Sequence, residues 1–480
     1  MIHERMLIGG KWVRSKNGDV MEVVNPAAGE VFAEVPLAGK SDVEDAINAA
    51  DSVFSSWSRM TPFERGKYLR KASELVLKRS EDIARLLTME QGKPLAEAEG
   101  EVIKGANILR YYAEEGERIY GRIIANEEPG TGSMVIYQPI GVAAAISPWN
   151  YPIELLAWKV GAALAAGCTL VAKLPSETPL SPLAFIKCLA DAGLPDCVLN
   201  AVTGPGAVIG PVLIGSPVVK KIAFTGSTEV GREVLKGSAE TLKKVSLELG
   251  GSLPMIVCKD CNLDAAVSGA VRRSFRNMGQ ICIAVNRIYV DFEIYEEFVE
   301  RFAKATEKLV IGNGLTDKCD LGPMCTPAGV EKTISHIQDA VEKGAKVVCG
   351  GKRPEGAKFE KGYFFEPTIL RDVNHNMLVM REETFGPLAG VMPFGTLDEA
   401  VELANDTRYG LAAIVFTQDI STAKRLCRDI AAGNIAVNNV DAGVINAPYG
   451  GWKDSGFGFE HGPEGLYEYL HAKHIRIRYL

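Results

Sequence analysis

The sequence lacks an apolar run long enough to cross a membrane. Its longest near-continuous apolar stretch, Val160 to Ala172, is bounded by lysines and is shorter than the roughly 20 residues that a spanning helix needs. The first ten residues contain Glu4 and Arg5 and have no apolar centre of the kind found in a signal peptide. We therefore expect a cytoplasmic chain that starts at residue 1 and does not associate with a membrane.

An excess of positive charge is also missing, as are internal repeats and low-complexity segments. Asp and Glu number 60 against 53 Lys and Arg, a formal net charge of −7. A mildly acidic chain has no general attraction for nucleic acid or anionic lipid, so we expect neither as a partner. Apolar residues at 47% of 480 residues are typical of a globular protein, here of about three domains by length.

Motifs for metal binding are scarce. Among 10 cysteines, Cys258 and Cys261 have a C-x-x-C spacing, but there is no second pair and no nearby histidine to complete the four ligands of a structural zinc site. We expect no metal, and free thiols in a reducing compartment. The 6 histidines are scattered, which counts against a thiol hydrolase that needs no cofactor.

What the sequence does contain is an alternation of strands and helices. The first 120 residues are expected to be rich in helix, with a capping box at Ser41 and Glu44 and a helix start at Pro62. From residue 140 onward strands and helices alternate in two successive cycles. This pattern predicts an α/β fold with two doubly wound parallel-sheet domains and a ligand cleft between them. The alternating tail, 470–480, predicts a strand that pairs or remains an exposed edge.

Two segments have the pattern of a nucleotide site. Gly226 and Ser227 lie between an apolar strand and a helix start, where backbone N–H groups can bind phosphate, although a tight turn with a serine cap has the same pattern. Lys173 ends another strand, so its side chain either points toward the ligand crevice or is simply solvated.

Three further side chains could support acyl chemistry. Cys282 follows a helix expected to end at Gly279; a loop position suits a nucleophile, although a lone cysteine is more often a small buried apolar residue. Glu248 ends an apolar strand, where burial would raise its pKa toward that of a useful general base, unless it is a paired structural carboxylate. Asn150 lies in a turn, where its amide could stabilise an oxyanion or simply serve the turn.

The order and spacing of these motifs resemble the aldehyde dehydrogenase superfamily over essentially the whole chain. The offset between Glu248 and Cys282, 282 − 248 = 34 residues, also fits that family. The stretches that carry the resemblance are PWNYP at 148–152, KLPSETP at 173–179, FTGS at 224–227, LELGG at 247–251, FRNMGQIC at 275–282, EETFGP at 382–387, PYGG at 448–451 and SG at 455–456.

The resemblance implies NAD(P)-dependent oxidation of an aldehyde to a carboxylic acid through a thiohemiacetal and a thioester. Cys282 would be the nucleophile, Glu248 the general base, and Asn150 together with the Cys282 backbone N–H the oxyanion hole. The cofactor-binding residues would be Trp149, Lys173, Ser176, Gly226, Ser227, Glu383 and Phe385.

The choice between NAD and NADP depends on one position in this comparison. Some NAD-preferring relatives have a glutamate three residues after the strand-end lysine, where its charge would repel a 2′-phosphate. That residue is Ser176 here, so we expect NADP to be accepted, alongside NAD.

The sequence looks most like succinate-semialdehyde dehydrogenases, yet it departs from them at the expected carboxylate anchors. A carboxylate-bearing substrate needs arginine donors, because guanidinium binds carboxylate in a bidentate way. Arg276 matches one of these anchors, but it could also form a structural ion pair. Trp158 and Gly443 stand where the other two anchors are expected. We therefore expect a small neutral or hydroxylated aldehyde, bound near Trp158 and Arg276, with succinate semialdehyde as the alternative.

The family fold further implies a division of the chain. Residues 1–120 and 140–250 would form the dinucleotide-binding domain, 251–450 the catalytic domain, and 121–139 with 451–480 a small β arm and C-terminal strand for a homodimer or homotetramer. Two alternatives stay open: a coenzyme A-acylating enzyme, against which Glu248 counts, and a non-catalytic protein that retains the fold.

Overall fold

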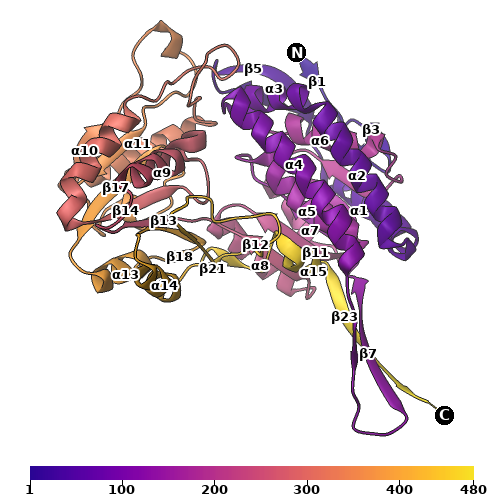
Figure 1. Cartoon of the computed structure of the whole chain (residues 1–480). Helices are drawn as coiled ribbons and strands as arrows, with labels where there is room; N and C mark the ends of the chain where they lie inside the picture. Colours follow the sequence, from indigo (N-terminus) through magenta and orange to yellow (C-terminus); the bar gives the residue numbers. More distant parts are fainter. Residues whose placement is uncertain (480) are drawn as a thin grey trace.

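The structure is a computed structural model that describes residues 1–479. Figure 1 shows two lobes and a long arm that carries β7 and β23 and projects away from them, with the C-terminus near its tip. Within the described residues, no helix is both long enough and apolar enough to cross a membrane.

The first lobe is built on a sheet whose central strands run parallel. Its order is β22-β12-β11-β8-β9-β10-β2-β3, and the strands from β12 to β10 are parallel to their neighbours. The central strands β8 and β9 are buried along their whole length, as expected for a parallel sheet covered on both faces. The bounds are β2 Met6–Ile8, β3 Lys11–Val13, β8 Val142–Ile146, β9 Thr169–Lys173, β10 Leu199–Val202, β11 Val219–Thr225, β12 Lys244–Glu248 and β22 Gly456–Phe457.

Helices cover both faces of this sheet. Pro62 opens α2, and Thr61 and Glu64 form its capping box. The box expected at Ser41 is wrong: α1 begins at Lys40, and the Asp42 carboxylate accepts the Gly39 backbone N–H, because Asp42 can reach back over the first turn. The bounds are α1 Lys40–Arg59, α2 Pro62–Lys78, α3 Ser80–Gln91, α4 Leu95–Glu115, α5 Pro152–Ala166, α6 Leu180–Asp191, α7 Gly206–Gly215, α8 Thr228–Ala239 and the short η1 Gly116–Arg118.

The N-terminal residues form strands, and the helices that make the first 120 residues rich in helix follow them. A small sheet has the order β1-β5-β4, with β1 Ile2–His3, β4 Val20–Asn25 and β5 Glu30–Pro36. Ala33 and Val35 are buried in it at a spacing of two, which is the period of a half-buried strand. The helical part of the first 120 residues therefore begins only at residue 40.

The second lobe has its own largely parallel sheet, so the expected fold class is confirmed. The order is β15-β16-β17-β14-β13-β19-β20, and only β15 is antiparallel to its neighbour among the described strands. Its strands are β13 Leu253–Val257, β14 Val285–Asp291, β15 Lys346–Cys349, β16 Thr368–Arg371, β17 Leu388–Phe394, β19 Ala412–Phe416 and β20 Asn434–Val437. Its helices are α9 Leu263–Phe275, η2 Arg276–Gly279, η3 Phe292–Ile294, α10 Tyr295–Thr306, α11 Pro327–Glu342, η4 Ala357–Phe359, α12 Leu378–Arg381, α13 Leu397–Asn405 and α14 Ile420–Asp429.

The arm joins two distant parts of the chain. Its sheet has the order β23-β7-β6, and β23 pairs antiparallel with β7 from Leu470 opposite Pro139 to Arg478 opposite Thr131. Of residues 451–480, only β23 lies in the arm, because β22 joins the first lobe's sheet and α15 packs against α5. The remaining bounds are β6 Arg122–Ile124, β7 Thr131–Pro139, β18 Tyr409–Gly410, β21 Trp452–Lys453, α15 Gly462–Tyr467 and β23 Leu470–Arg478.

Candidate active site

A cleft of about 810 Å³ lies between the two lobes. Strand ends and helix starts of the first lobe form one wall, and residues around Cys282, α11 and Glu383 form the other. Most of the residues predicted from the sequence meet there: Trp149, Asn150, Lys173, Ser176, Gly226, Ser227, Cys282, Glu383 and Phe385 all line the cleft.

Cys282 is partly exposed in this cleft. Helix α9 ends at Phe275, earlier than expected, and η2 leads from it to the thiol. Gly251 allows close packing behind the loop, since a Cβ on it would lie 2.2 Å from the Cys282 carbonyl oxygen. Burial, followed by the charges of Glu383 and Glu248, raises the pKa of the thiol above its ordinary value. The thiol therefore holds its proton at neutral pH until a base takes it.

Glu248 ends β12 as a buried carboxyl group. It is only 6% exposed, and neither carboxylate oxygen has a hydrogen-bond partner among residues 1–479. Burial raises its pKa well above the ordinary value, the charge of Glu460 raises it further, and Lys159 opposes both effects. A carboxyl group with free oxygens and a raised pKa can accept and release a proton in the range where enzymes work.

Lys159 and Glu460 were not predicted as site residues. Lys159 Nζ lies 2.5 Å from Glu460 Oε1 and donates a 2.6 Å hydrogen bond to Thr225 Oγ1. The signal that could have found them is the lysine itself, because it stands within the apolar stretch of α5 that follows Glu154, and a buried cation needs a partner. The partner lies 301 residues away, so the sequence alone does not identify it.

Asn150 connects the first lobe to the loop of Cys282. Its side-chain Nδ2 donates a 2.9 Å hydrogen bond to the Gln280 carbonyl, and it is 3% exposed. An Nδ2 group carries two hydrogens, so one N–H remains for a ligand in the cleft. The backbone carbonyl of Asn150 accepts hydrogen bonds from Lys93 and Asn277.

Lys173 fits a bound nucleotide better than a solvated strand end. It is 7% exposed, and within residues 1–479 its ammonium makes no hydrogen bond or ion pair, so the solvated alternative is wrong. Burial lowers its pKa. This ammonium lines the cleft and has no protein partner in the described part of the chain, so it suits the hydroxyl oxygens of a ribose or the oxygens of a phosphate attached to that ribose. Nearby, Ser176 Oγ donates to the Gly204 carbonyl at 3.2 Å.

Gly226 and Ser227 precede the first turn of α8. Ser227 caps the helix, because its hydroxyl accepts the Val230 N–H at 3.3 Å. The serine-cap alternative is therefore correct for the hydroxyl, while the helix start still faces the cleft. A phosphate can bind there through backbone N–H groups and the helix dipole.

Glu383 and Phe385 lie across the cleft from this helix start. Glu383 Oε1 accepts the Gly251 N–H at 2.9 Å, and burial raises its pKa to about 7. The Phe385 ring meets that of Trp149 edge to face, with centroids 5.4 Å apart. Lys332 on α11, not predicted from the sequence, donates to the Glu383 carbonyl at 2.6 Å and lines the same wall.

The two expected substrate contacts lie elsewhere. Trp158 is 1% exposed, its indole stacks on His461 with centroids 3.6 Å apart, and Tyr112 meets it edge to face. It does not line this cleft, and its contact with the substrate stays a prediction. Arg276 Nε donates to Glu97 Oε1 at 3.0 Å, which is the structural ion pair left open as an alternative.

Comparison with known proteins identifies the family of this chain. The sequence matches the aldehyde dehydrogenase family over residues 12–475. It is 45% identical to a glutarate-semialdehyde dehydrogenase of Pseudomonas putida over 480 residues, and 44% identical to the NADP(+) succinate-semialdehyde dehydrogenase of Escherichia coli over 480 residues. Each alignment covers 99% of this chain and 98% of the relative.

Solved structures agree as well. An NADP-dependent enzyme of Escherichia coli superposes with a TM-score of 0.97 at 44% identity, covering 99% of this chain and 98% of that one. Betaine aldehyde dehydrogenase of Staphylococcus aureus, solved with NAD+, superposes with a TM-score of 0.96 at 36% identity, covering 99% and 94%. The family expected from the motifs is thus confirmed: this chain belongs to the aldehyde dehydrogenase family, whose members oxidise aldehydes with NAD or NADP.

Proposed function

We propose that the enzyme oxidises a small neutral or hydroxylated aldehyde to its carboxylic acid, with Cys282 as nucleophile. The observation that carries this proposal is the meeting of Cys282 and the Asn150 amide in one cleft, with Glu248 close enough to raise the pKa of the thiol. The function is supported further by Lys173 and the start of α8, which fit a dinucleotide.

The first half of the reaction joins the substrate to the protein. Cys282, which is partly exposed in the cleft, releases its proton to solvent, and its sulfur forms a bond to the aldehyde carbon while the carbonyl π electrons move to oxygen. The free N–H of Asn150 and the backbone N–H of Cys282 donate to that oxyanion, as preorganised donors do in acyl transfer. Lys173 and the start of α8 would hold a nicotinamide dinucleotide, which would supply the acceptor for the hydride that leaves the tetrahedral carbon, and loss of that hydride would leave a thioester on Cys282.

The second half releases the acid. Glu248 takes a proton from a water molecule, whose oxygen attacks the thioester carbon, and the carbon–sulfur bond breaks to return the Cys282 thiolate. Because the Glu248 oxygens have no protein partner among residues 1–479, they are free to bind that water. Lys159 and Glu460 adjust the pKa of this carboxyl group through their charges.

The preference for a neutral substrate follows from the missing anchors. Gly443 has no side chain to supply the expected hydroxyl, and a Cβ there would lie 3.2 Å from the Tyr449 ring and 3.5 Å from His461. Trp158 replaces one arginine, and Arg276 already pairs with Glu97. No unpaired guanidinium is offered to a substrate carboxylate by these positions.

Succinate semialdehyde is the second candidate. Arg276 favours it, as do the names of the relatives from Escherichia coli and Pseudomonas putida, which are semialdehyde dehydrogenases. Arg276 could bind a carboxylate on one face while it contacts Glu97 on the other, since guanidinium has five N–H donors.

A matched substrate panel separates the two candidates. We expect kcat/KM for butanal and 4-hydroxybutanal to exceed that for succinate semialdehyde by at least about tenfold, because a carboxylate without a paired cation loses more than about 1.4 kcal/mol. Each aldehyde is assayed with NAD and NADP, with and without coenzyme A. Highest kcat/KM for succinate semialdehyde would contradict the neutral preference, and a requirement for coenzyme A would contradict hydrolysis by water.

Ser176→Glu tests the choice of cofactor. The new carboxylate would lie near the 2′-phosphate of NADP, so we expect kcat/KM for NADP to fall by about tenfold or more while that for NAD changes less than about threefold. Ser176→Gln has nearly the same size without the charge and serves as the control. Equal loss in both variants would show that size rather than charge matters, and unchanged NADP use would contradict the assignment.

We also propose a cytoplasmic homodimer or homotetramer. The support for assembly is β23, whose second edge pairs with no strand among residues 1–479 and would complete a sheet with another copy.

A further inference from the structure

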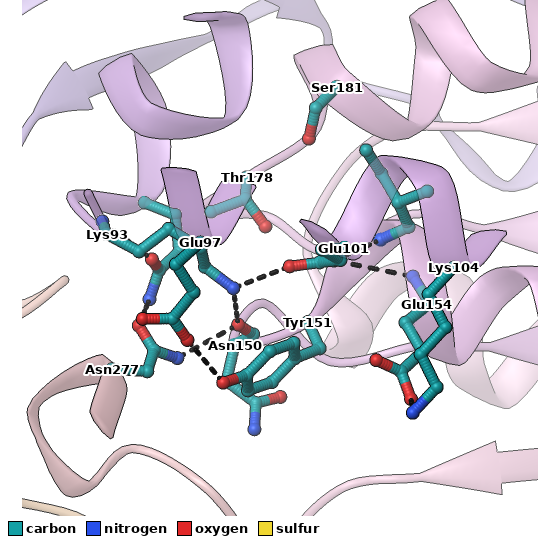
Figure 2. Close-up of polar contacts among 12 residues, drawn as sticks. Lys93, Glu97, Glu101, Lys104, Asn150, Tyr151, Glu154, Thr178, Ser181 and Asn277 are labelled. Atoms are coloured by element: carbon teal, nitrogen blue, oxygen red, sulfur yellow. Dashed lines mark hydrogen bonds and ion pairs between the residues drawn. The ribbon is translucent and has the colours of Figure 1, made fainter. Parts of the chain in front are cut away.

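Lys93 is a buried cation beside residues 148–152, the turn that carries Asn150. It lies between α3 and α4, and neither its side chain nor that of Glu101 on α4 has any exposed surface. Lys93 Nζ lies 2.5 Å from Glu101 Oε2 and donates a 2.8 Å hydrogen bond to the Asn150 carbonyl, as Figure 2 shows. The ammonium also lies 3.6 Å from the centre of the Tyr151 ring. The ammonium therefore contacts both Asn150 and the residue that follows it.

Stability alone does not account for this ion pair. Desolvation costs several kcal/mol per buried ion, and well-packed apolar residues of similar volume are often as stable or more so. The pair does determine where its neighbours lie. Glu101 Oε1 accepts the backbone N–H groups of Ile153 at 2.9 Å and Glu154 at 3.3 Å, which belong to the first turn of α5. Lys93 and Glu101 therefore hold both Asn150 and the first turn of α5, which follows it in the chain.

The Asn150 carbonyl is also held by Asn277, which belongs to the segment that leads to Cys282. Asn277 Nδ2 donates to the Asn150 carbonyl at 3.1 Å, and Asn277 Oδ1 accepts Gln91 Nε2 at 2.9 Å. Asn277 and the residue after it have φ of 50° and 57°, a conformation that costs non-glycine residues about 1–3 kcal/mol and persists only where the surroundings hold it. Since Asn150 Nδ2 in turn donates to Gln280, the amide and the loop of Cys282 form one hydrogen-bonded unit.

We propose that Lys93 is a positioning residue of the oxyanion site: its ammonium, held by Glu101, fixes the Asn150 amide relative to Cys282. The inference rests on the proposed function, because only a reaction through an oxyanion uses that amide. Lys93 touches no reacting atom itself. A misplacement of about 1 Å can cost about a hundredfold in rate, and loss of an oxyanion donor costs about 10²–10³.

The test removes the ion pair in the full-length enzyme. The variant Lys93→Met/Glu101→Gln avoids an unpaired buried carboxylate. We expect its pre-steady-state burst of reduced cofactor to slow by about 30- to 100-fold, while the Kd for the cofactor changes by less than about threefold. Asn150→Ala should slow the burst similarly, and adding the pair variant to Asn150→Ala should slow it little further, because both act through one group.

Alkylation of Cys282 by iodoacetamide distinguishes positioning from a general loss of structure. Alkylation displaces iodide and forms no oxyanion, so we expect its rate to change by less than about threefold in the pair variant. If that variant does not fold, Lys93→Arg, which keeps the charge but moves its N–H groups, should slow the burst and leave alkylation unchanged.

Three results would overturn the proposal: a burst at the wild-type rate, alkylation slowed as much as the burst, or losses that multiply in the Asn150→Ala background. Wild-type enzyme that reduces no cofactor with any aldehyde would instead overturn the proposed function.

Discussion

Cys282→Ala is expected to lower aldehyde-dependent reduction of NAD or NADP by at least about 10⁴-fold, because removal of an activated nucleophile leaves only binding and oxyanion stabilisation. An aldehyde does not readily release hydride until its carbon is tetrahedral and its oxygen anionic. Without the sulfur, no group in the cleft makes that adduct. The measurement is the absorbance of the reduced nicotinamide under saturating aldehyde and cofactor.

The controls for this variant separate chemistry from folding. Cys427→Ala changes an exposed thiol on α14 and is expected to retain wild-type activity. Cofactor binding, followed by fluorescence, should persist in Cys282→Ala, since Lys173 and the start of α8 are unchanged. Reduction that continues at the wild-type rate in Cys282→Ala would rule out a covalent mechanism at this residue.

Glu248→Gln is expected to complete one turnover and then stall. Acylation and hydride release need the thiol and the oxyanion donors, whereas hydrolysis of the thioester needs a base for water. We expect a burst close to one equivalent of reduced cofactor per active site, followed by a steady rate about 10²–10⁴ lower than wild type. Rapid-mixing absorbance measures both phases, and Cys282→Ala, which should give no burst, serves as the control.

The pH dependence of the steady rate is a second test of Glu248 as the base for hydrolysis. Its folded-state pKa is raised above the ordinary carboxyl value, so the basic form is lost as pH falls through that raised pKa. In wild-type enzyme limited by hydrolysis, the steady rate should rise with pH through this pKa and then level off. The rise should be absent in Glu248→Gln, which has no group to titrate there. A sustained wild-type rate in the variant would contradict the role of Glu248.

Much of the site could be predicted because its signals are local in the sequence. Lys173 and Glu248 each end a parallel strand, and strands in such a sheet present their carboxyl ends to one crevice. The order of the motifs then identified the family and its fold. Nine of the twelve predicted site residues line the cleft, whereas Glu248, Trp158 and Arg276 do not.

The local sequence pattern does not reveal contacts between residues that lie far apart in the chain. Trp158 stacks on His461, which comes 303 residues later, and no local signal indicates this contact. The partner of Lys159 is equally hard to predict from the sequence, because Glu460 lies near the far end of the chain. Lys93 escaped notice because a lysine in a turn is usually solvated, and only the fold shows that α4 supplies Glu101 to pair with it.

The proposed reaction requires that the substrate becomes covalently joined to the Cys282 sulfur. Glu248→Gln, mixed with aldehyde and cofactor and quenched in acid after the burst, should yield a single modified peptide. Mass spectrometry should place the added mass on Cys282, equal to the aldehyde less two hydrogen atoms, as a thioester requires. An unmodified Cys282 after a full burst, or an adduct on another residue, would contradict the account.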